Sequence, residues 1–173
     1  MSGRMTKVGV LALIGCLFLV LFSACNVTQV PTHKIYEYGS IESLPKDRLI
    51  KQKNAFTYRP GDEIMLTWKP QATGETMDKA PQKVSIEAGL IGPFPSLDEL
   101  NKAVSFDRSS MTGPVATTMT PVQTDNWTDT AVSTKLKLPS SLKSGYYMLV
   151  QRILTAGRGP KTPIPTGSVI YVP

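Results

Sequence analysis

The sequence predicts an all-β protein, an antiparallel β-sandwich with one short helix, preceded by an N-terminal signal or anchor segment. Apolar and polar residues alternate with a period of two in several short runs, which is typical of strands buried on one face. The 14 prolines and 13 glycines lie mainly in the connections between these runs. Many short strands joined by such connections favour a sandwich.

The N-terminal segment has the pattern of an export signal. The first seven residues are basic and contain no acid, residues 8–22 are uncharged and apolar, and two small residues stand directly before Cys25. At ~1.5 Å per residue the apolar run forms a helix of roughly 22 Å, which is shorter than the ~30 Å hydrocarbon core. These features indicate a secretory signal rather than a stable membrane span.

The order basic, apolar, small, small, Cys resembles the lipobox of bacterial lipoprotein signal peptides. This resemblance implies cleavage before Cys25, acylation of its thiol, palmitate included, and a chain tethered on the extracytoplasmic side of the cell membrane or outer membrane. The alternative is an uncleaved anchor helix with a chance cysteine. Both interpretations export the rest of the chain, so we do not expect a nucleic acid partner.

Cysteine and histidine are scarce, which excludes several kinds of chemistry. The chain has two cysteines, Cys16 and Cys25, and one histidine, His33. After cleavage the mature domain has no free thiol, so it has no disulfide, no cysteine-bound metal and no thiol nucleophile. One histidine without a cysteine cannot complete a zinc site, and a catalytic triad would need His33 to fold back from the tether against a pocket. We therefore expect no metal and no cofactor.

We expect three regions: the signal peptide over 1–24, the lipidated Cys25 with a tether and a possible edge strand over 25–53, and the sandwich over 54–173.

Removing the signal lowers the net charge from +6 to +4, because Arg4 and Lys7 leave with it. Within the tether region the basic excess lies at four residues, Lys46, Arg48, Lys51 and Lys53. This basic cluster could contact anionic lipid head groups or wall polymers. Alternatively it is a solvated linker, and we favour this interpretation because short runs of mixed charge are usually only solvated.

Five segments are predicted to be strands, at 63–69, 83–91, 134–139, 145–155 and 167–173. Their inward residues are predicted to be Ile64, Leu66, Trp68, Val84, Ile86, Ala88, Leu90, Leu136 and Leu138. The apolar segment 145–155 is expected in the middle of a sheet. Four connections are predicted as turns, at 71–82, 109–115, 139–145 and 157–167. A capping box, Ser96 with Glu99, predicts one helix of about two turns over 96–104.

Two segments resemble bacterial immunoglobulin-like domains. PGDEIMLTW at 60–68 is similar to their second strand, and LPSSLKSGYYMLVQ at 138–151 is similar to a later part of the same domains. The resemblance covers residues 54–173 and implies an immunoglobulin-like β-sandwich without implying an activity. The disulfide of antibody domains is missing, and we expect Trp68 to fill its place in the core.

Three residues are candidates for binding: Trp127, Tyr146 and Arg152. Trp127 stands in a polar loop, where it either stacks on a sugar or protein partner or caps one end of the core, the interpretation we favour. Tyr146 and Arg152 lie on the face opposite Tyr147. If that face is open, it suits the docking of a partner. If the helix or a loop covers it, it belongs to the core. We favour the covered face, because a strand that is apolar on both faces is usually buried on both.

The acidic residues give only weak catalytic signals. Three pairs are candidates for acid–base work, Asp62 with Glu63, Asp98 with Glu99, and Asp125 with Asp129. A calcium site at 124–129 lacks the ligand density of a calcium loop. We therefore predict a lipid-anchored envelope binding or assembly module without catalysis, with a protein or glycan partner. The alternatives are a small envelope hydrolase using carboxylates, or an enzyme inhibitor that presents the proline-rich loop 156–167.

Overall fold

The structure, a computed structural model, describes residues 31–42 and 44–173 of the chain. The strands described below belong to the unit His33–Pro173. The predicted signal peptide and Cys25 lie outside the described residues. Within the described ranges, no helix has the length and apolar character needed to cross a membrane.

The larger of two layers is a sheet in which the strands follow the order β2-β3-β11-β10-β6-β7, and β8 also pairs with β6. Its strands are β2 (Leu49–Ile50), β3 (Ala55–Thr57), β6 (Lys83–Phe94), β7 (Val115–Thr118), β8 (Val122–Asp125), β10 (Gly145–Thr155) and β11 (Ile164–Val172). All neighbours are antiparallel except β3 and β11, which are parallel. β10 lies between β11 and β6, which confirms the central place predicted for 145–155.

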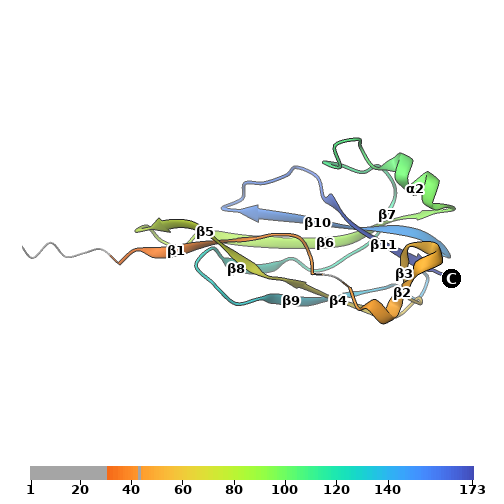
Figure 1. Ribbon diagram of the computed structural model, residues 1–173, viewed down its shortest axis with the longest axis horizontal. Coiled ribbons are helices and arrows are strands. Elements are labelled where there is room, and N and C mark those ends of the chain that lie inside the picture. Colours follow the sequence, from red (N-terminus) through yellow and green to blue (C-terminus); the bar gives the residue numbers. More distant parts are fainter. Residues whose placement is uncertain (1–30, 43) are drawn as a thin grey trace, which may run out of the picture. The chain divides into compact units, whose positions relative to one another are not determined.

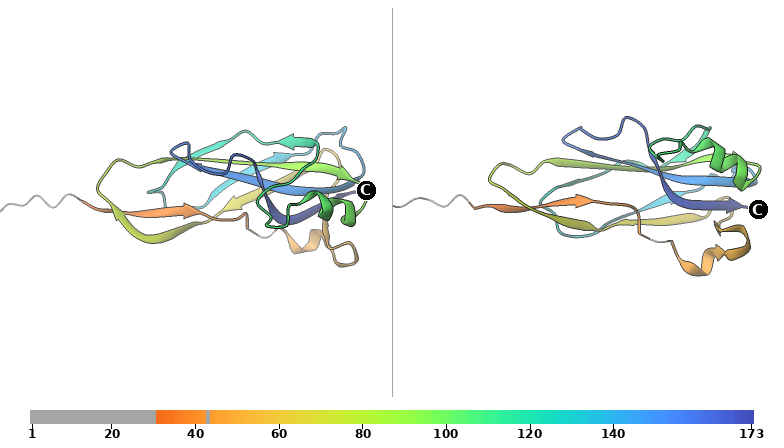
Figure 2. Two further views of the ribbon diagram at one scale, coloured as in Figure 1. Left: turned by 90° about the horizontal axis from the view of Figure 1, so that it is seen from above. Right: turned by 45° about the horizontal axis from the view of Figure 1, so that its top comes forward.

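A second layer faces this sheet (Figures 1 and 2). It contains β4 (Glu63–Trp68) paired with β9 (Val132–Lys137). After one residue, Lys69, the chain continues as β5 (Pro70–Met77), which pairs with β1 (His33–Tyr38). β1 lies within 25–53, where the sequence predicted a possible edge strand. After it, the short 3-10 turns η2 (Lys46–Arg48) and η3 (Lys51–Lys53) lead into β3.

The core lies between the two layers and contains the alternate residues that the sequence predicted. Each of these is buried: Ile64, Leu66, Trp68, Val84, Ile86, Ala88, Leu90, Leu136 and Leu138. Trp68 is fully buried, as expected of a residue that fills the place of a disulfide. Burial of each strand on its inward face is what fixes the register of the sheets.

Tyr147 makes a contact typical of immunoglobulin-like sandwiches. Its hydroxyl donates to the carbonyl oxygen of Lys143 at 2.6 Å, four residues upstream. A tyrosine that binds back to the preceding corner in this way is a hallmark of the fold. Burial raises the pKa of the Tyr147 hydroxyl, which keeps it protonated as a donor. Together with the two facing layers of mainly antiparallel strands, this contact makes the domain an immunoglobulin-like β-sandwich.

The one helix, α2 (Leu97–Ala103), begins where the capping box predicts. The Ser96 hydroxyl oxygen accepts from the backbone N–H of Glu99 at 3.2 Å. Leu100 is fully buried and belongs to a second apolar cluster, on the face of the large sheet that points away from β4 and β9. Met148 and Val150 belong to the same cluster, so the face opposite Tyr147 is largely covered, as favoured from the sequence.

Five strands lie where the sequence predicted no strand. The predicted turn 71–82 contains most of β5, and no strand was predicted at β2, β3, β7 or β8. β5 is exposed along most of its length, so its residues need no apolar alternation, and backbone hydrogen bonds to β1 hold it in place. An exposed edge strand of this kind leaves no periodic signal in the sequence.

Candidate functional site

We call the side of the large sheet that points away from β4 and β9 the outer face. α2 covers one part of it, and beside the helix lies a groove of about 400 Å³. The groove is lined by Glu87, Ala88, Gly89, Leu90, Ile91, Met111, Gly113, Val115, Thr118, Met119, Pro121, Val150, Thr162 and Pro163. Two loops flank it, 105–114 after α2 and 156–163 between β10 and β11, and Figure 1 shows both on the same side of β6 and β10.

Paired residues of β6 and β10 form the floor of the groove. Gly89 lies opposite Val150 in the register, and Thr118 of β7 lies opposite Gly89 on the other side. A side chain at Gly89 would place its Cβ 2.6 Å from the carbonyl oxygen of Thr117. Glycine is therefore required for β7 to pair here, and it leaves a recess above β6 that Thr118 borders.

The first wall is a loop that its own polar groups hold in shape. Val104 and Met111 form an isolated bridge across its base. Inside the loop, Asp107 Oδ1 accepts from the backbone N–H of Ser109 at 3.1 Å and from the hydroxyl of Ser105 at 2.8 Å. These hydrogen bonds stabilise the charged carboxylate and lower the pKa of Asp107 from 3.8 to about 2, with the larger effect from Ser109 and the smaller from Ser105. The loop thus holds Met111 at the groove.

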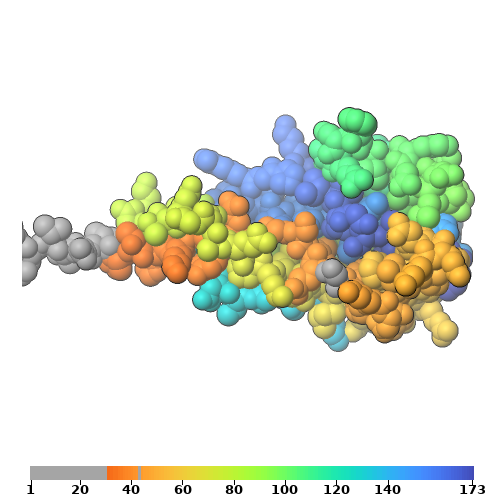
Figure 3. Space-filling view, viewed as in Figure 1, coloured from red at the N-terminus to blue at the C-terminus, as the bar shows by residue number. Residues whose placement is uncertain are grey.

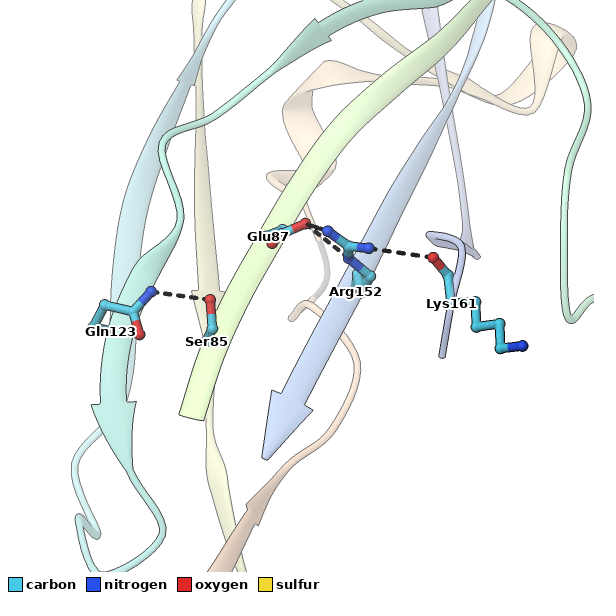
Figure 4. A network of polar contacts seen from close by, with 5 residues as sticks. All are labelled: Ser85, Glu87, Gln123, Arg152 and Lys161. Carbon is cyan, nitrogen blue, oxygen red and sulfur yellow. Dashed lines mark hydrogen bonds and ion pairs between the residues drawn. The ribbon is translucent and has the colours of Figure 1, made fainter. Parts of the chain in front are cut away.

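The second wall is attached to the sheet through Arg152 (Figure 4). The guanidinium donates from Nε and Nη2 to one oxygen of Glu87, at 2.8 and 2.6 Å. Its Nη1 donates to the carbonyl oxygen of Lys161 at 3.2 Å. Lys161 is followed by Thr162 and Pro163, which line the groove. One arginine therefore connects β6, β10 and the loop 156–163.

The groove is apolar and has no net charge. Glu87 is the one charged residue among its lining residues, and Arg152 neutralises it. The pair is only about a quarter to a third exposed, so water screens it less than a surface pair. Predominantly apolar clefts of this volume with a few polar groups are typical of small-molecule sites.

Of the three predicted binding residues, Arg152 lies next to the groove, while Tyr146 lies beneath α2. The Tyr146 ring packs against the apolar cluster under the helix and lies 5.0 Å from the ring of Tyr171, centroid to centroid. Tyr146 therefore contributes to packing on the outer face.

Trp127 follows β8 and stacks on His33, with ring centroids 3.8 Å apart and an angle of 12° between the planes. Its Nε1 is buried and has no hydrogen-bond partner among the described residues. β6 pairs with Asp125 at one end and with Tyr146 at the other. At ~3.3 Å per residue its length separates Trp127 from Tyr146 by more than 30 Å. The predicted residues therefore do not form one site.

Each predicted carboxylate pair has at least one member held by a neighbouring group. The contacts are Asp62 with the N–H of Arg59 at 2.9 Å, Glu63 with Lys135 Nζ at 2.7 Å, Glu99 with Lys102 Nζ at 2.7 Å, and Asp125 with the N–H of Trp127 at 2.9 Å. These are the roles of turn, strand-pair and helix residues. These contacts give the carboxylates a structural role in place of a catalytic one.

The segment 124–129 forms a polar turn. Asn126 is buried, and its Oδ1 accepts from the backbone N–H of Gln82 at 2.8 Å. Asp125 Oδ1 accepts from the backbone of Trp127 and from both the N–H and the hydroxyl of Thr128. Within residues 31–42 and 44–173 no three His, Cys, Asp or Glu side chains group in a way that could hold a metal ion.

Sequence reasoning did not find the groove, and it did not single out Gln151. The groove depends on two loops that meet over β6, which no local pattern reports. Gln151, by contrast, left a signal, because it is a polar residue at an inward position of an apolar strand. Its side chain is buried and bonded to Trp68 at 3.0 Å.

The comparisons with known proteins assign no family to this chain. No family model matches the chain, and no curated protein matches it. One similar solved structure is the crystal structure of a Niemann-Pick type C2 protein from Japanese carpenter ant, with a TM-score of 0.39 and 9% identity, covering 82% of this chain and 95% of that one. The proposals below therefore rest on the residues of this chain.

Proposed function

We propose that this chain is a lipid-anchored binding module of the bacterial cell envelope, without catalysis, which holds a neutral apolar small molecule in the groove on the outer face. The observation that carries the proposal is the groove itself, a recess of about 400 Å³ between two loops that are each held by polar contacts. A pre-formed apolar site needs little ordering of the protein on binding, which favours affinity.

The chemistry of the lining supports a neutral ligand. An anionic ligand would meet Glu87, and a cationic ligand would compete with Arg152 for the same carboxylate oxygen. An apolar body instead gains ~0.8 kcal/mol for each buried methylene group. Thr118 and Thr162 are exposed residues of the lining, and their hydroxyls suit one weakly polar group on the ligand.

Anchoring is proposed from the sequence. The order of residues before Cys25 supports cleavage and acylation at this cysteine, and an acylated chain would carry the domain on the extracytoplasmic side of a membrane. One acyl chain binds a membrane only weakly, whereas more than one gives stable anchoring. The test is mass spectrometry of the membrane-extracted chain beside Cys25→Ala. Loss of residues 1–24 with added acyl mass, absent in the variant, is expected; an intact N-terminus with a free thiol would overturn the anchor.

The groove is tested with 1-N-phenylnaphthylamine, a neutral apolar fluorophore, titrated into the full chain in a non-fluorescent neutral detergent below its critical micelle concentration. We expect saturable fluorescence enhancement in the native chain. Thr118→Trp fills the rim of the groove from an exposed edge-strand position and is expected to weaken binding at least tenfold. Thr120→Trp is the matched control, since Thr120 is exposed nearby and does not line the groove.

Each outcome of this titration decides the proposal. Binding that Thr118→Trp weakens and Thr120→Trp leaves unchanged supports a small-molecule site. Absence of saturable binding, or equal binding by all three chains, would overturn it. A protein or glycan partner would then be sought by cross-linking from the loop 156–163, which is also the segment that an enzyme inhibitor would present.

A further inference from the structure

The excess positive charge of the domain is gathered at one of its ends. We call this the basic end, and it comprises η2, η3, the loop 58–63 and the segment 135–143. It carries eight basic side chains, Lys46, Arg48, Lys51, Lys53, Arg59, Lys135, Lys137 and Lys143, and three acidic ones, Asp47, Asp62 and Glu63. The rest of the described chain carries nine basic and ten acidic residues, α2 included. The net charge of the domain therefore originates here.

The basic end lies far from the point where the tether joins the domain. Figure 1 shows η2, η3 and the C-terminus at one extreme of the sandwich and the start of β1 at the other. In Figure 3 the orange segment that contains residues 46–53 forms the lower part of the surface at that extreme, below the green segment that contains α2. β6 runs between the two ends, and its length at ~3.3 Å per residue is about 40 Å. The basic cluster is thus close to the tether in sequence and distant from His33 in space.

Most cations of the basic end make no ion pair with another described residue. Lys135 pairs with Glu63, and the Lys53 ammonium lies 3.3 Å from the centre of the Tyr171 ring. Arg48 reaches Asp62 only at 3.5 Å. The remaining cations have no ion-pair partner among the described residues: Lys46, Lys51, Arg59, Lys137 and Lys143. They are available to an external anion.

An open polar depression of about 460 Å³ lies within the basic end. It is lined by Asp47, Arg48, Ile50, Thr57, Arg59 and Asp62. Thr57 Oγ1 is buried and has no hydrogen-bond partner in the described part of the chain. The Thr57 hydroxyl is closed off from solvent, and Asp47 and Asp62 balance the charges of Arg48 and Arg59, so the depression itself carries no net charge. The Arg59 guanidinium makes no ion pair with a described residue, and a guanidinium fork matches phosphate geometry.

We propose that the basic end binds an anionic polymer with repeated phosphate groups through its cations that have no ion-pair partner among the described residues. A polymer suits the surface because the free cations extend on both sides of the depression, where several phosphates bind at once. The choice of a polymer over lipid head groups rests on the proposed anchor at Cys25. A chain anchored before His33 would enter the domain at the end opposite the basic end, which favours a polymer as the partner.

The test measures binding of the full chain, in neutral detergent, to fluorescently labelled long-chain inorganic polyphosphate by anisotropy. The variant Lys46→Gln, Lys51→Gln, Arg59→Gln removes three exposed cations that make no ion pair with a described residue. The matched control Lys34→Gln, Lys79→Gln, Lys83→Gln removes the same charge from exposed positions outside the basic end. We expect the first variant to bind at least tenfold more weakly than the native chain and the control to bind within about twofold of it. Thermal unfolding of both variants verifies that each is folded.

Salt and vesicles complete the test. Native affinity is expected to fall steeply as salt rises from low to physiological concentration, because exposed charges are screened. Absence of binding to polyphosphate, or an equal loss in both variants, would overturn the site. Stronger binding to vesicles containing anionic phospholipid than to polyphosphate, lost in the same variant, would overturn the polymer in favour of a membrane-facing surface. None of these outcomes depends on the groove.

Discussion

The side-chain oxygen of Gln151 accepts a hydrogen bond from the indole Nε1 of Trp68 at 3.0 Å inside the core. The same oxygen accepts from the backbone N–H of Ile41 at 3.2 Å. Through one amide, the central strand β10 is connected to β4 in the opposite layer and to the segment that follows β1. The core therefore contains a specific polar link in addition to its apolar packing, and such a link favours one alignment of the layers.

Replacement of this amide is expected to destabilise the domain. Gln151→Leu leaves the Trp68 N–H buried without an acceptor and removes one partner of Ile41 N–H. Each unsatisfied buried donor costs about 1–3 kcal/mol, and Ile41 is partly exposed, so we expect a total of about 2–3 kcal/mol. Chemical denaturation measures it. Gln123→Leu, at an exposed position of β8, is the control and is expected to change stability by less than about 0.5 kcal/mol. Equal stability of the two variants would contradict a structural role for Gln151.

The hydroxyl of Tyr147 is expected to stabilise the corner before β10. Tyr147→Phe removes the 2.6 Å hydrogen bond to the Lys143 carbonyl and keeps the ring in the core. We expect a loss of about 1–2 kcal/mol in the free energy of unfolding. Tyr146→Phe is the neighbouring control, because the Tyr146 contacts described above are ring contacts. An equal effect of the two substitutions would show that the corner contact contributes nothing specific.

The sandwich was predictable because its strands are buried on one face. Alternation identified Ile64, Leu66, Trp68 and their counterparts in β6 and β9, and the capping box identified α2. The segment of β5 has no apolar face, so backbone pairing alone determines it, and sequence reasoning took it for a turn. The signal for a strand is the burial of its side chains, and it is missing where the strand is exposed.

The candidate site was less predictable than the fold. Arg152 was identified as a candidate from its face of β10, but its partners Glu87 and Lys161 come from segments remote in sequence. Glu87 was simply an outward residue of a strand, and the carbonyl of Lys161 leaves no side-chain signal. A site formed by the packing of loops over a sheet depends on tertiary contacts, which a period of two cannot report.

The contact of Arg152 with two segments is expected to hold the loop 156–163 against the sheet. Arg152→Met keeps the aliphatic stem and removes every donor, which releases the Lys161 carbonyl and leaves Glu87 without its cation. We expect faster cleavage by trypsin after Arg158 and Lys161, by about fivefold or more, because local opening exposes the loop. Fluorophore binding in the groove is expected to weaken in parallel.

Arg152→Lys serves as the control for charge, since a lysine can pair with Glu87 but cannot donate in three fixed directions. We expect cleavage at a rate between those of the native chain and Arg152→Met. If Arg152→Met is cleaved no faster than the native chain, the loop does not depend on this contact, and the second wall of the groove must be held in another way.

The loop 105–114 is expected to respond to acid through Asp107. The hydrogen bonds from Ser109 and Ser105 lower the pKa of this carboxyl from 3.8 to about 2 in the folded chain. A lowered folded pKa means that the loop contacts are fully present above the unfolded pKa of about 4 and are lost as the pH falls through about 2. Amide shifts of Ser109 and Ser110, followed by NMR from pH 5 to pH 1.5, are expected to titrate with a midpoint near 2. Asp107→Asn is expected to abolish this titration, since the amide does not ionise. A midpoint near 4 in the native chain would show that Asp107 is not held by the serines, and that the first wall of the groove is looser than described.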